Sequence, residues 1–316
     1  MFKYWNLRFL VCLVFSISIL GFGAGAAELQ GTITVSGAWA IYPTVVAWGD
    51  AFHKLHPGVR IDVSAGGAGK GAADAIGGMA DIGMVSRDPD PAELAKGAVA
   101  TYILHDAVFP VVSDKNPALG DLLRKGVTKK ELIGLYMTGK LSNWSELADS
   151  DVDKPVHVYT RSDSCGAAAS WAKFLGNKKQ EDLRGVGVYG DPGLLEAARR
   201  DPIGIGYNNF SYVFDARGKV VAGAKLLPID ANENGKVDAD ELFNDRPSAV
   251  RAIEAGRYPA TRKNYLFTKG KPQGLVAEFI KFALSEPGTA VVNRVQTSLP
   301  VVRSERQKLL KWLSAD

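Results

Sequence analysis

The chain has 316 residues, of which 46% are hydrophobic and 23% charged, with 34 glycines and two cysteines. This composition supplies a buried core and excludes a disordered chain, a coiled coil and a collagen-like fibre. The formal charge of +4 is small for this length, and no basic stripe alternates with aromatic residues, which excludes a typical nucleic-acid-binding protein. The length suits two domains or one large domain.

Residues 1–26 have the order of a cleavable signal peptide. Lys3 and Arg8 precede an apolar run of about 14 residues, which is shorter than the ~20 residues that span a bilayer. Small residues follow the run and lead to a cleavage point near Ala26. We therefore expect export to the periplasm. Loss of Lys3 and Arg8 lowers the formal charge from +4 to +2, and Cys12 is lost as well. The remaining cysteine, Cys165, then has no partner for an internal disulfide.

Short β-branched strands, Gly-rich turns and helices alternate along the first third of the chain. The strand predicted at 32–35 ends in a Gly turn, and apolar residues then recur at helical spacing up to Leu55. A second strand at 61–63, a run of small residues at 64–71 and an Ala-rich helix to Met79 repeat the unit. Strands that alternate with helices indicate a parallel α/β sheet, whose ligands bind at the carboxyl ends of the strands.

The same character returns in the second half. Thr128 and Glu131 form a capping box at a helix start, and a strand near 156–159 is followed by a helix that begins at Ser164-Cys165-Gly166. Apolar extended runs at 107–112 and 265–267 suit strands that cross between two lobes. We predict an α/β fold of two lobes, the first formed by 27–108 plus 267–316 and the second by 109–266.

Several segments together carry a family resemblance. They are the Ser36–Pro43 turn, the Ser64–Gly71 run, the strand and turn Ala80–Arg87, the pair Asn143-Trp144, the loop Arg161–Gly166, and the segment Tyr265–Leu284. The chain resembles the phosphate-binding family among the periplasmic solute-binding proteins of ABC importers. The resemblance implies a type II two-lobe fold, a ligand cleft between the lobes, no catalytic activity, and a membrane permease as partner. We expect a monomer.

The resemblance also implies which residues line the cleft. Glycine turns bring backbone N–H groups to helix N-termini, which suits an anion, and Arg161 would add a bidentate charge. The candidate ligand-binding residues are Ser36, Gly37, Ala38, Trp39, Ala40, Gly67, Ala68, Gly69, Ser86, Arg87, Arg161, Asp163, Cys165, Gly166 and Ala167.

Departures from the family pattern leave the ligand open. Phosphate-binding members of the family place Ser or Thr hydroxyls where this chain has Ala40 or Ile41, Ala68, Cys165 and Ala167. Each hydrogen bond to a charged ligand contributes about 1.5–3 kcal/mol, so losing several would weaken phosphate binding strongly. The resemblance favours an oxyanion or an oxyanion-bearing small molecule. Trp39 and the missing hydroxyls favour the alternative, a larger and less polar ligand. A ligand sensor that signals to a membrane receptor is an alternative to import.

An enzyme would depend on Cys165, because a cysteine at a helix N-terminus beside Arg161 has the setting that lowers a thiol pKa. No base lies next to it in the sequence. The four histidines are scattered and predict no zinc cluster, and Gly69-Lys70 lacks the spacing of a nucleotide-binding P-loop. We therefore predict a binding protein without catalytic residues.

Residues 230–241 match the twelve-residue EF-hand pattern at each ligand position. Gly235 stands at the turn position, where the pattern requires glycine. The predicted ligands are the side chains of Asp230, Asn232, Asn234, Asp238 and Glu241 and the carbonyl of Lys236. An extended segment with Pro228 precedes the loop instead of a helix, so we expect a structural Ca²⁺ that ties down the second lobe at about residues 225–245.

Overall fold

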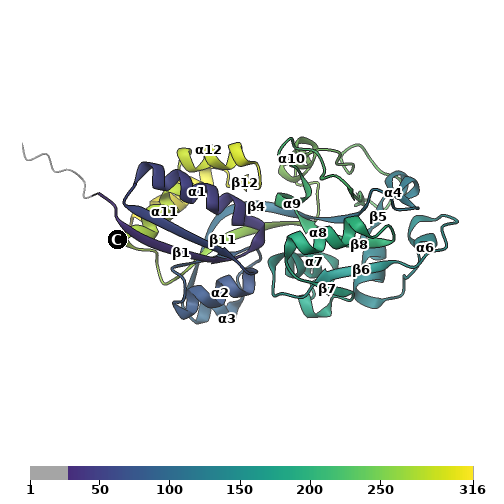
Figure 1. Ribbon diagram of the computed structural model, residues 1–316, viewed down its shortest axis with the longest axis horizontal. Coiled ribbons are helices and arrows are strands. Elements are labelled where there is room, and N and C mark those ends of the chain that lie inside the picture. Colours follow the sequence, from purple (N-terminus) through teal and green to yellow (C-terminus); the bar gives the residue numbers. More distant parts are fainter. Residues whose placement is uncertain (1–27, 316) are drawn as a thin grey trace, which may run out of the picture.

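The computed structural model describes residues 28–315, so the predicted signal peptide lies outside the described residues. Two lobes lie side by side along the long axis of the molecule, and extended strands run between them (Figure 1). In this part of the chain no helix has the length and apolar character needed to cross a bilayer.

The first lobe combines elements from both ends of the described chain. Helices cover both faces of its strands, with α1, α11 and α12 on one face and α2 and α3 on the other (Figure 1). Its elements are β1 (Gly31–Gly37), the single turn η1 (Trp39–Ile41), α1 (Tyr42–Leu55), β2 (Val59–Ala65), α2 (Ala68–Gly77), β3 (Ile82–Val85), α3 (Pro91–Ala95), α11 (Gly274–Leu284), α12 (Glu286–Val295), β12 (Leu299–Pro300) and α13 (Arg303–Ser314).

The second lobe is formed by the middle of the chain. Its elements are α4 (Leu119–Lys125), β5 (Val127–Thr128), α5 (Lys129–Ile133), the π-helical turn η2 (Gly134–Thr138), α6 (Trp144–Ala148), β6 (His157–Arg161), α7 (Gly166–Gly176), η3 (Gln180–Asp182), β7 (Val186–Val188), α8 (Gly190–Arg200), β8 (Gly204–Asn209), α9 (Phe210–Val213), β9 (Ala224–Leu226), β10 (Ile229–Asp230) and α10 (Arg246–Glu254).

One sheet runs through both lobes in the order β2-β1-β3-β11-β4-β8-β6-β7. Strands β1, β2 and β3 are parallel, as are β6, β7 and β8, which confirms the α/β fold expected from the alternating pattern. The long strand β4 (Ala98–Ser113) and its antiparallel partner β11 (Thr261–Lys269) lie at the centre of this order. The first part of β4 pairs with β11 and its last residues pair with β8 and β9, so β4 belongs to both lobes.

Local sequence signals place the helix starts. The capping box at Thr128 and Glu131 is formed, because each side chain bonds to the other residue's backbone N–H. Helix α7 begins after Cys165, whose Sγ accepts a hydrogen bond from the backbone N–H of Ala168 at 3.3 Å. Both helices therefore begin where the sequence predicts.

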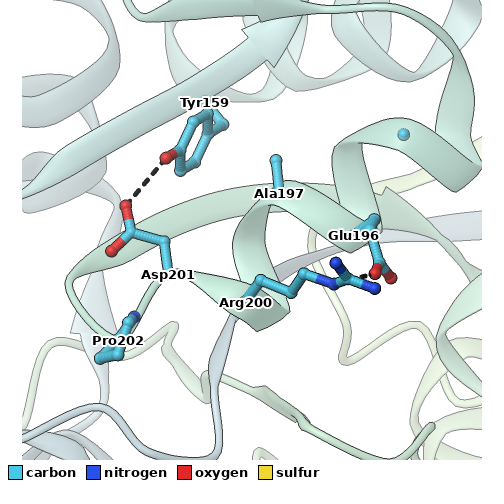
Figure 2. A pocket seen from close by; sticks show the side chains of 7 residues that line it. Tyr159, Glu196, Ala197, Arg200, Asp201 and Pro202 are labelled. Carbon is cyan, nitrogen blue, oxygen red and sulfur yellow. Dashed lines mark hydrogen bonds and ion pairs between the residues drawn. The ribbon is translucent and has the colours of Figure 1, made fainter.

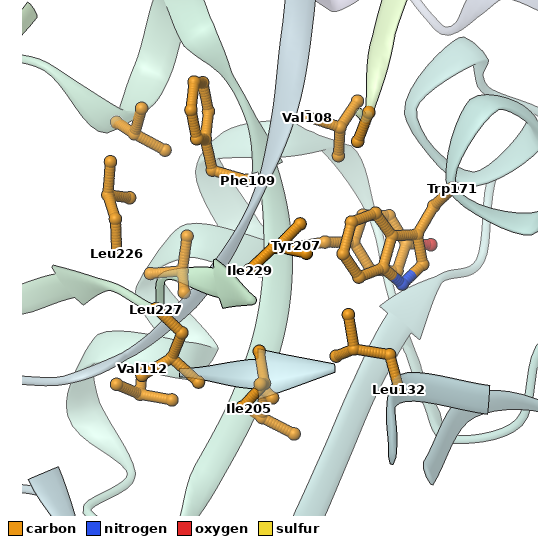
Figure 3. Close-up of a cluster of buried hydrophobic side chains, with 14 of the residues drawn as sticks. Val108, Phe109, Val112, Leu132, Trp171, Ile205, Tyr207, Leu226, Leu227 and Ile229 are labelled. Carbon is orange, nitrogen blue, oxygen red and sulfur yellow. The ribbon is translucent and has the colours of Figure 1, made fainter. Parts of the chain in front are cut away.

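Each lobe has its own buried cluster. In the first lobe, Trp48 is fully buried and donates its Nε1–H to the carbonyl of Gly288 at 2.8 Å. In the second, Trp171 stacks on Tyr207 with ring centres 5.5 Å apart, among aliphatic side chains from β4, β8 and the 226–229 segment (Figure 3). Along β4 the clusters divide between Leu104 and Ala107.

A buried polar cluster marks the crossing between the lobes. Asp106 on β4 accepts hydrogen bonds from Arg262 on β11 at 2.7 and 2.9 Å, and both residues are buried. Arg262 also donates to Asn209, at the end of β8 in the second lobe, and Asn264 donates to Asp106 at 3.2 Å. These bonds connect the two crossing strands to the second lobe.

Candidate functional site

The first turns of α2 and α7 meet where the two lobes touch. Gly69, in α2 of the first lobe, donates its backbone N–H to the carbonyl of Ser164, which precedes α7 of the second lobe, at 3.2 Å. Glycine permits this approach: a Cβ at Gly166 would lie 2.2 Å from the carbonyl oxygen of Ser86. Gly67 has φ +95° and a Cβ there would lie 2.4 Å from the carbonyl oxygen of Ser164. The lobes are therefore closed on each other at these turns.

Free backbone donors remain at these two helix starts. Gly66 and Gly67 both donate to the carbonyl of Gly37, so their N–H groups are already used inside the first lobe. The N–H groups of Ala68, Gly166 and Ala167 have no hydrogen-bond partner among the described residues. Because the first N–H groups of a helix point outward and carry its positive dipole end, two such starts that face each other favour an anion.

Arg161, at the end of β6, is buried and holds two carboxylates. Its Nε and Nη2 donate to Asp163 at 2.8 and 2.5 Å, and its Nη1 lies 2.9 Å from Oδ2 of Asp191, in the first turn of α8. All three side chains are nearly fully buried. Two carboxylates against one guanidinium leave the group one negative charge in excess if all are ionised. Arg161 is thus less available to an anion than the sequence suggested.

Burial and charge act on this group in opposite directions. Burial raises the pKa of Asp191, the positive charges of Arg161 and Arg262 oppose that shift, and the result is a pKa above the ordinary carboxyl value. Burial alone would lower the pKa of Arg161, but Asp191 and Asp163 raise it above its usual value, so the guanidinium stays charged. The Asp191 carboxyl therefore gains a proton more readily than an ordinary carboxyl.

Aromatic residues from both lobes lie beside the turn that carries Asp191. The Trp39 ring, from η1 of the first lobe, would lie 3.4 Å from a Cβ at Gly190 in the second lobe. It meets Tyr189 edge-on with ring centres 6.1 Å apart, and the Tyr212 hydroxyl donates to the Trp39 carbonyl at 3.3 Å. Trp39 therefore contacts the second lobe directly, and it lies beside the turn that carries Asp191.

Several predicted ligand residues are engaged inside the first lobe. The Ser36 hydroxyl donates to Asp74 at 2.6 Å and accepts from Lys70 at 2.9 Å. Arg87 forms an ion pair with Glu93 at 2.5 Å. Ser36 and Arg87 would have to exchange these partners before binding a ligand.

The remaining predicted residues divide into packing and interface positions. A Cβ at Gly37 would lie 2.4 Å from the carbonyl oxygen of Met84, so this glycine serves strand and helix packing. Ser86 faces Gly166 across the lobes. The other predicted residues with small side chains are buried, and they are Ala38, Ala40, Ala68, Cys165 and Ala167.

The setting of Cys165 does not favour a reactive thiol. Burial raises its pKa to about 12, and the opposing effect of Arg161 is too small to reverse this because Asp191 and Asp163 lie nearby. The thiol instead caps helix α7. Cys165 is therefore a protonated packing residue.

Sequence reasoning missed Asp191, Tyr189 and Tyr212. The turn Tyr189-Gly190-Asp191 follows a strand and begins a helix, as the predicted binding turns do. This strand–glycine–helix pattern could have been recognised in the sequence. Its pairing with Arg161 is a tertiary contact between residues that are distant in sequence. That contact was not readable from spacing.

An open surface pocket lies away from the interlobe site. It is lined by Tyr159, Gly193 and the C-terminal half of α8 with Asp201 and Pro202 (Figure 2). Asp191, at the interlobe site, stands at the opposite end of α8. Tyr159 donates its hydroxyl to Asp201 at 2.8 Å and Arg200 pairs with Glu196, so the polar groups drawn there are satisfied by one another.

The 230–241 loop bends around its own polar groups. Asp230 is buried and accepts from the backbone N–H groups of Asn234 at 3.2 Å and Gly235 at 2.8 Å. Asp238 accepts from the side-chain amides of Asn232 at 2.9 Å and Asn234 at 3.0 Å. The Glu241 carboxylate accepts from Ala231 N–H at 2.9 Å and from Asp238 N–H at 3.1 Å.

Carboxylates do not cluster in this loop as the structure has it. Across residues 28–315, no three His, Cys, Asp or Glu side chains are grouped closely enough to hold a metal ion. The amide oxygens of Asn232 and Asn234 accept hydrogen bonds from the backbone N–H groups of Asn234 at 3.1 Å and Lys236 at 3.0 Å. The residues at the ligand positions carry carboxylate and amide oxygens, which are the hard oxygen ligands that calcium prefers.

Comparison with known proteins identifies relatives over most of the chain. Residues 23–287 match the family model described as a PBP superfamily domain. The phosphate-binding protein PstS of Bacillus subtilis is 28% identical over 280 residues, which cover 88% of this chain and 83% of that protein. The phosphate-binding protein PstS of Methanocaldococcus jannaschii is 27% identical over 263 residues, which cover 71% and 64%.

Solved structures share the fold. A substrate-binding protein from Clostridium perfringens, assigned to a phosphate ABC transporter and containing bound phosphate, aligns with a TM-score of 0.71 and 24% identity over 86% of this chain and 100% of that one. An ABC-type phosphate transport receptor from Vibrio cholerae aligns with a TM-score of 0.63 and 19% identity over 86% and 100%. These likenesses confirm the predicted two-lobe fold.

Proposed function

The chain belongs to the PBP superfamily, and we propose that it is the exported solute-binding protein of an ABC importer. It holds a phosphate-like oxyanion between its lobes and delivers it to a membrane permease. The relatives named for phosphate binding support this proposal.

One observation carries the choice of an oxyanion. The free N–H groups of Ala68, Gly166 and Ala167 lie at two helix starts, one from each lobe, that meet across the interface. Such donors supply positive potential without a net charge. A small anion bound between them would be contacted by both lobes and would stabilise the closed form.

Titration of the mature chain with inorganic phosphate by isothermal calorimetry tests the proposal. We expect saturable one-to-one binding that is tight enough for uptake, at about micromolar Kd, which corresponds to roughly 8 kcal/mol. If the folded protein binds neither phosphate nor any other small anion, the proposed function is wrong. Sequencing the N-terminus of protein recovered from the periplasm tests export, because the predicted cleavage point is near Ala26.

A less polar ligand is the second candidate. Trp39 lies at the interface between two buried alanines, Ala38 and Ala40, and on the other lobe Cys165 and Ala167 are buried on either side of Gly166. Apolar side chains in the segments that meet at the interface favour a ligand with an apolar part beside its anionic group. Native mass spectrometry of protein purified from its own periplasm would distinguish the candidates by ligand mass.

We also propose that the 230–241 loop binds Ca²⁺. Support comes from the donor types at each ligand position of the twelve-residue pattern and from Gly235, which has φ +78° at the turn. A bound ion stabilises the folded chain by mass action, so millimolar Ca²⁺ should raise the melting temperature and EDTA should reverse this.

A matched pair of variants makes the calcium test specific. Glu241→Gln removes a charge from a ligand position, whereas Glu233→Gln removes one from a non-ligand position of the same loop. The rise in melting temperature with Ca²⁺ should disappear in the first variant and persist in the second. An equal response of both variants, or no response of the unmodified protein, would show that the loop does not use the ion.

A further inference from the structure

The indole nitrogen of Trp39 is a buried hydrogen-bond donor without a partner. Its Nε1 atom is shielded from solvent, and it has no hydrogen-bond partner among residues 28–315. An indole nitrogen can only donate, so it needs an acceptor. Buried polar atoms in folded proteins are nearly always paired, and this one therefore indicates an acceptor that the described chain does not supply.

The other buried tryptophans of the described chain differ from Trp39 in partner or in place. Trp48 and Trp144 each donate the indole N–H to a backbone carbonyl of their own lobe, at 2.8 and 3.0 Å. Trp171 also lacks a partner, but its ring belongs to the hydrophobic core of the second lobe. Trp39 combines an unpartnered N–H with a position where the two lobes meet.

The edge of the Trp39 ring that carries the nitrogen faces the second lobe. Cε2, which is bonded to Nε1, and its neighbour Cζ2 are the atoms nearest to Gly190, at 3.5 and 3.4 Å from a Cβ built there. Gly190 donates its N–H to Asp163 at 3.2 Å, and the other oxygen of that carboxylate lies 3.0 Å from a Cβ built at Gly67. Gly67 directly precedes α2. Trp39 is therefore separated from the start of α2 by one turn and one carboxylate.

Contacts with the second lobe hold the ring in place but do not use its N–H. The Tyr212 hydroxyl donates to the Trp39 carbonyl at 3.3 Å, and the Tyr189 ring meets the indole edge-on with ring centres 6.1 Å apart. The nearby Asp163 carboxylate accepts from Arg161 with both of its oxygens. The indole is thus positioned from two sides while its donor stays unused.

We propose that Trp39 is a ligand-binding residue that donates its indole N–H to an oxygen of the oxyanion held between the lobes. This inference rests on the proposed function. Ala68, Gly166 and Ala167 carry no polar side-chain atom, so the two helix starts contribute backbone N–H groups alone. The indole adds a neutral donor from a third segment, at a site where Arg161 is already held by two carboxylates.

The indole N–H signals of the mature protein test this directly. Loss of Trp5 with the signal peptide leaves five of the six tryptophans, so the ¹⁵N-labelled protein gives five indole signals by NMR. Inorganic phosphate should move the Trp39 signal downfield, because a hydrogen bond to a charged acceptor deshields the proton. The signals of Trp48 and Trp144 should move much less, since their N–H groups are already bonded. Each signal is assigned through its own backbone, so this measurement needs no variant.

Two variants measure what the N–H contributes to affinity. Trp39→Phe keeps an aromatic ring and removes the donor, so the phosphate Kd from calorimetry should rise about 10-fold or more, the effect of losing one hydrogen bond to a charged ligand. Trp312→Phe removes a partly exposed indole from α13 and should keep the original Kd within about twofold. Circular dichroism checks that both variants fold.

Each other outcome overturns the inference. If calorimetry shows phosphate binding but the Trp39 signal does not move, the N–H does not contact the ligand and the proposed function stands. An unchanged Kd in Trp39→Phe would make Trp39 an apolar wall of the site. If the unmodified protein does not bind phosphate, the proposed function fails first and the inference fails with it. Should Trp39→Phe not fold, the signals of the unmodified protein still decide.

Discussion

Gly69 of the first lobe donates its backbone N–H to the carbonyl of Ser164 in the second lobe at 3.2 Å. This bond joins a helix start to the residue before another helix start, so the closed arrangement of the lobes depends on backbone contact at glycine turns. A side chain at such a turn would separate the lobes without altering either core.

Gly166→Ala should weaken ligand binding while leaving the fold intact. Gly166 begins α7 and has no positive φ, so alanine suits the local backbone, but its Cβ would lie 2.2 Å from the Ser86 carbonyl across the interface. Because ligand binds the closed form, a lower population of that form weakens the apparent affinity in proportion. We expect a loss of about 10-fold or more in phosphate affinity by calorimetry.

Gly120→Ala is the control for this variant. Gly120 lies exposed in α4, with nothing within 4 Å of an added Cβ. It should keep the original affinity, and both variants should melt within a few degrees of the unmodified protein, about the shift that 1 kcal/mol causes in a chain of this size. Unchanged affinity in Gly166→Ala would show that closure at this turn is not needed.

Asp106→Asn should destabilise the protein strongly. It leaves the buried guanidinium of Arg262 without its carboxylate, and breaking a buried ion pair on one side costs about 3–5 kcal/mol. The urea midpoint should fall accordingly. Asp62→Asn removes an exposed partner of Arg60 and should cost about 1 kcal/mol or less. Similar midpoints for the two variants would contradict a structural role of the crossing cluster.

Local patterns predicted the frame of the molecule and part of the site. The capping box at Thr128 and the helix start at Cys165 depend on neighbours in the sequence, so both were readable before the structure. The sequence did not show which hydrogen-bond or ion-pair partner each polar side chain has. Ser36 donates a hydrogen bond to Asp74, and Arg87 forms an ion pair with Glu93. Those choices depend on which helix packs beside which strand.

Acid should remove the contribution of Asp201 to stability. Burial alone would raise the pKa of Asp201, but hydrogen bonds from His157, Tyr159 and the backbone N–H of Ile203 lower it below the ordinary value (Figure 2 shows the Tyr159 bond). A carboxyl whose pKa is lower in the folded state stabilises the fold above its unfolded pKa of about 3.9, and the benefit is lost as the pH falls through the folded value.

Comparison with Asp201→Asn measures this effect. At pH 7 the variant should have the lower melting temperature. This gap in melting temperature should narrow from about pH 4 downward, because the Asp201 side chain of the unmodified protein then becomes protonated and loses its charge. Melting scans at steps of pH follow the gap. A gap that stays constant to the most acidic pH at which both proteins fold would exclude this carboxylate as its source.

Cys165 should resist thiol reagents in the folded protein. Burial raises its pKa to about 12 even though Arg161 lies nearby, and only the thiolate reacts. At pH 8 a chromogenic disulfide reagent should label the native mature chain very slowly and label one thiol promptly in guanidinium chloride. Cys165→Ser should fold and bind the ligand at least as well, since a serine hydroxyl can also cap α7. Rapid labelling of the native protein, or loss of binding in Cys165→Ser, would instead point to a chemical role for the thiol.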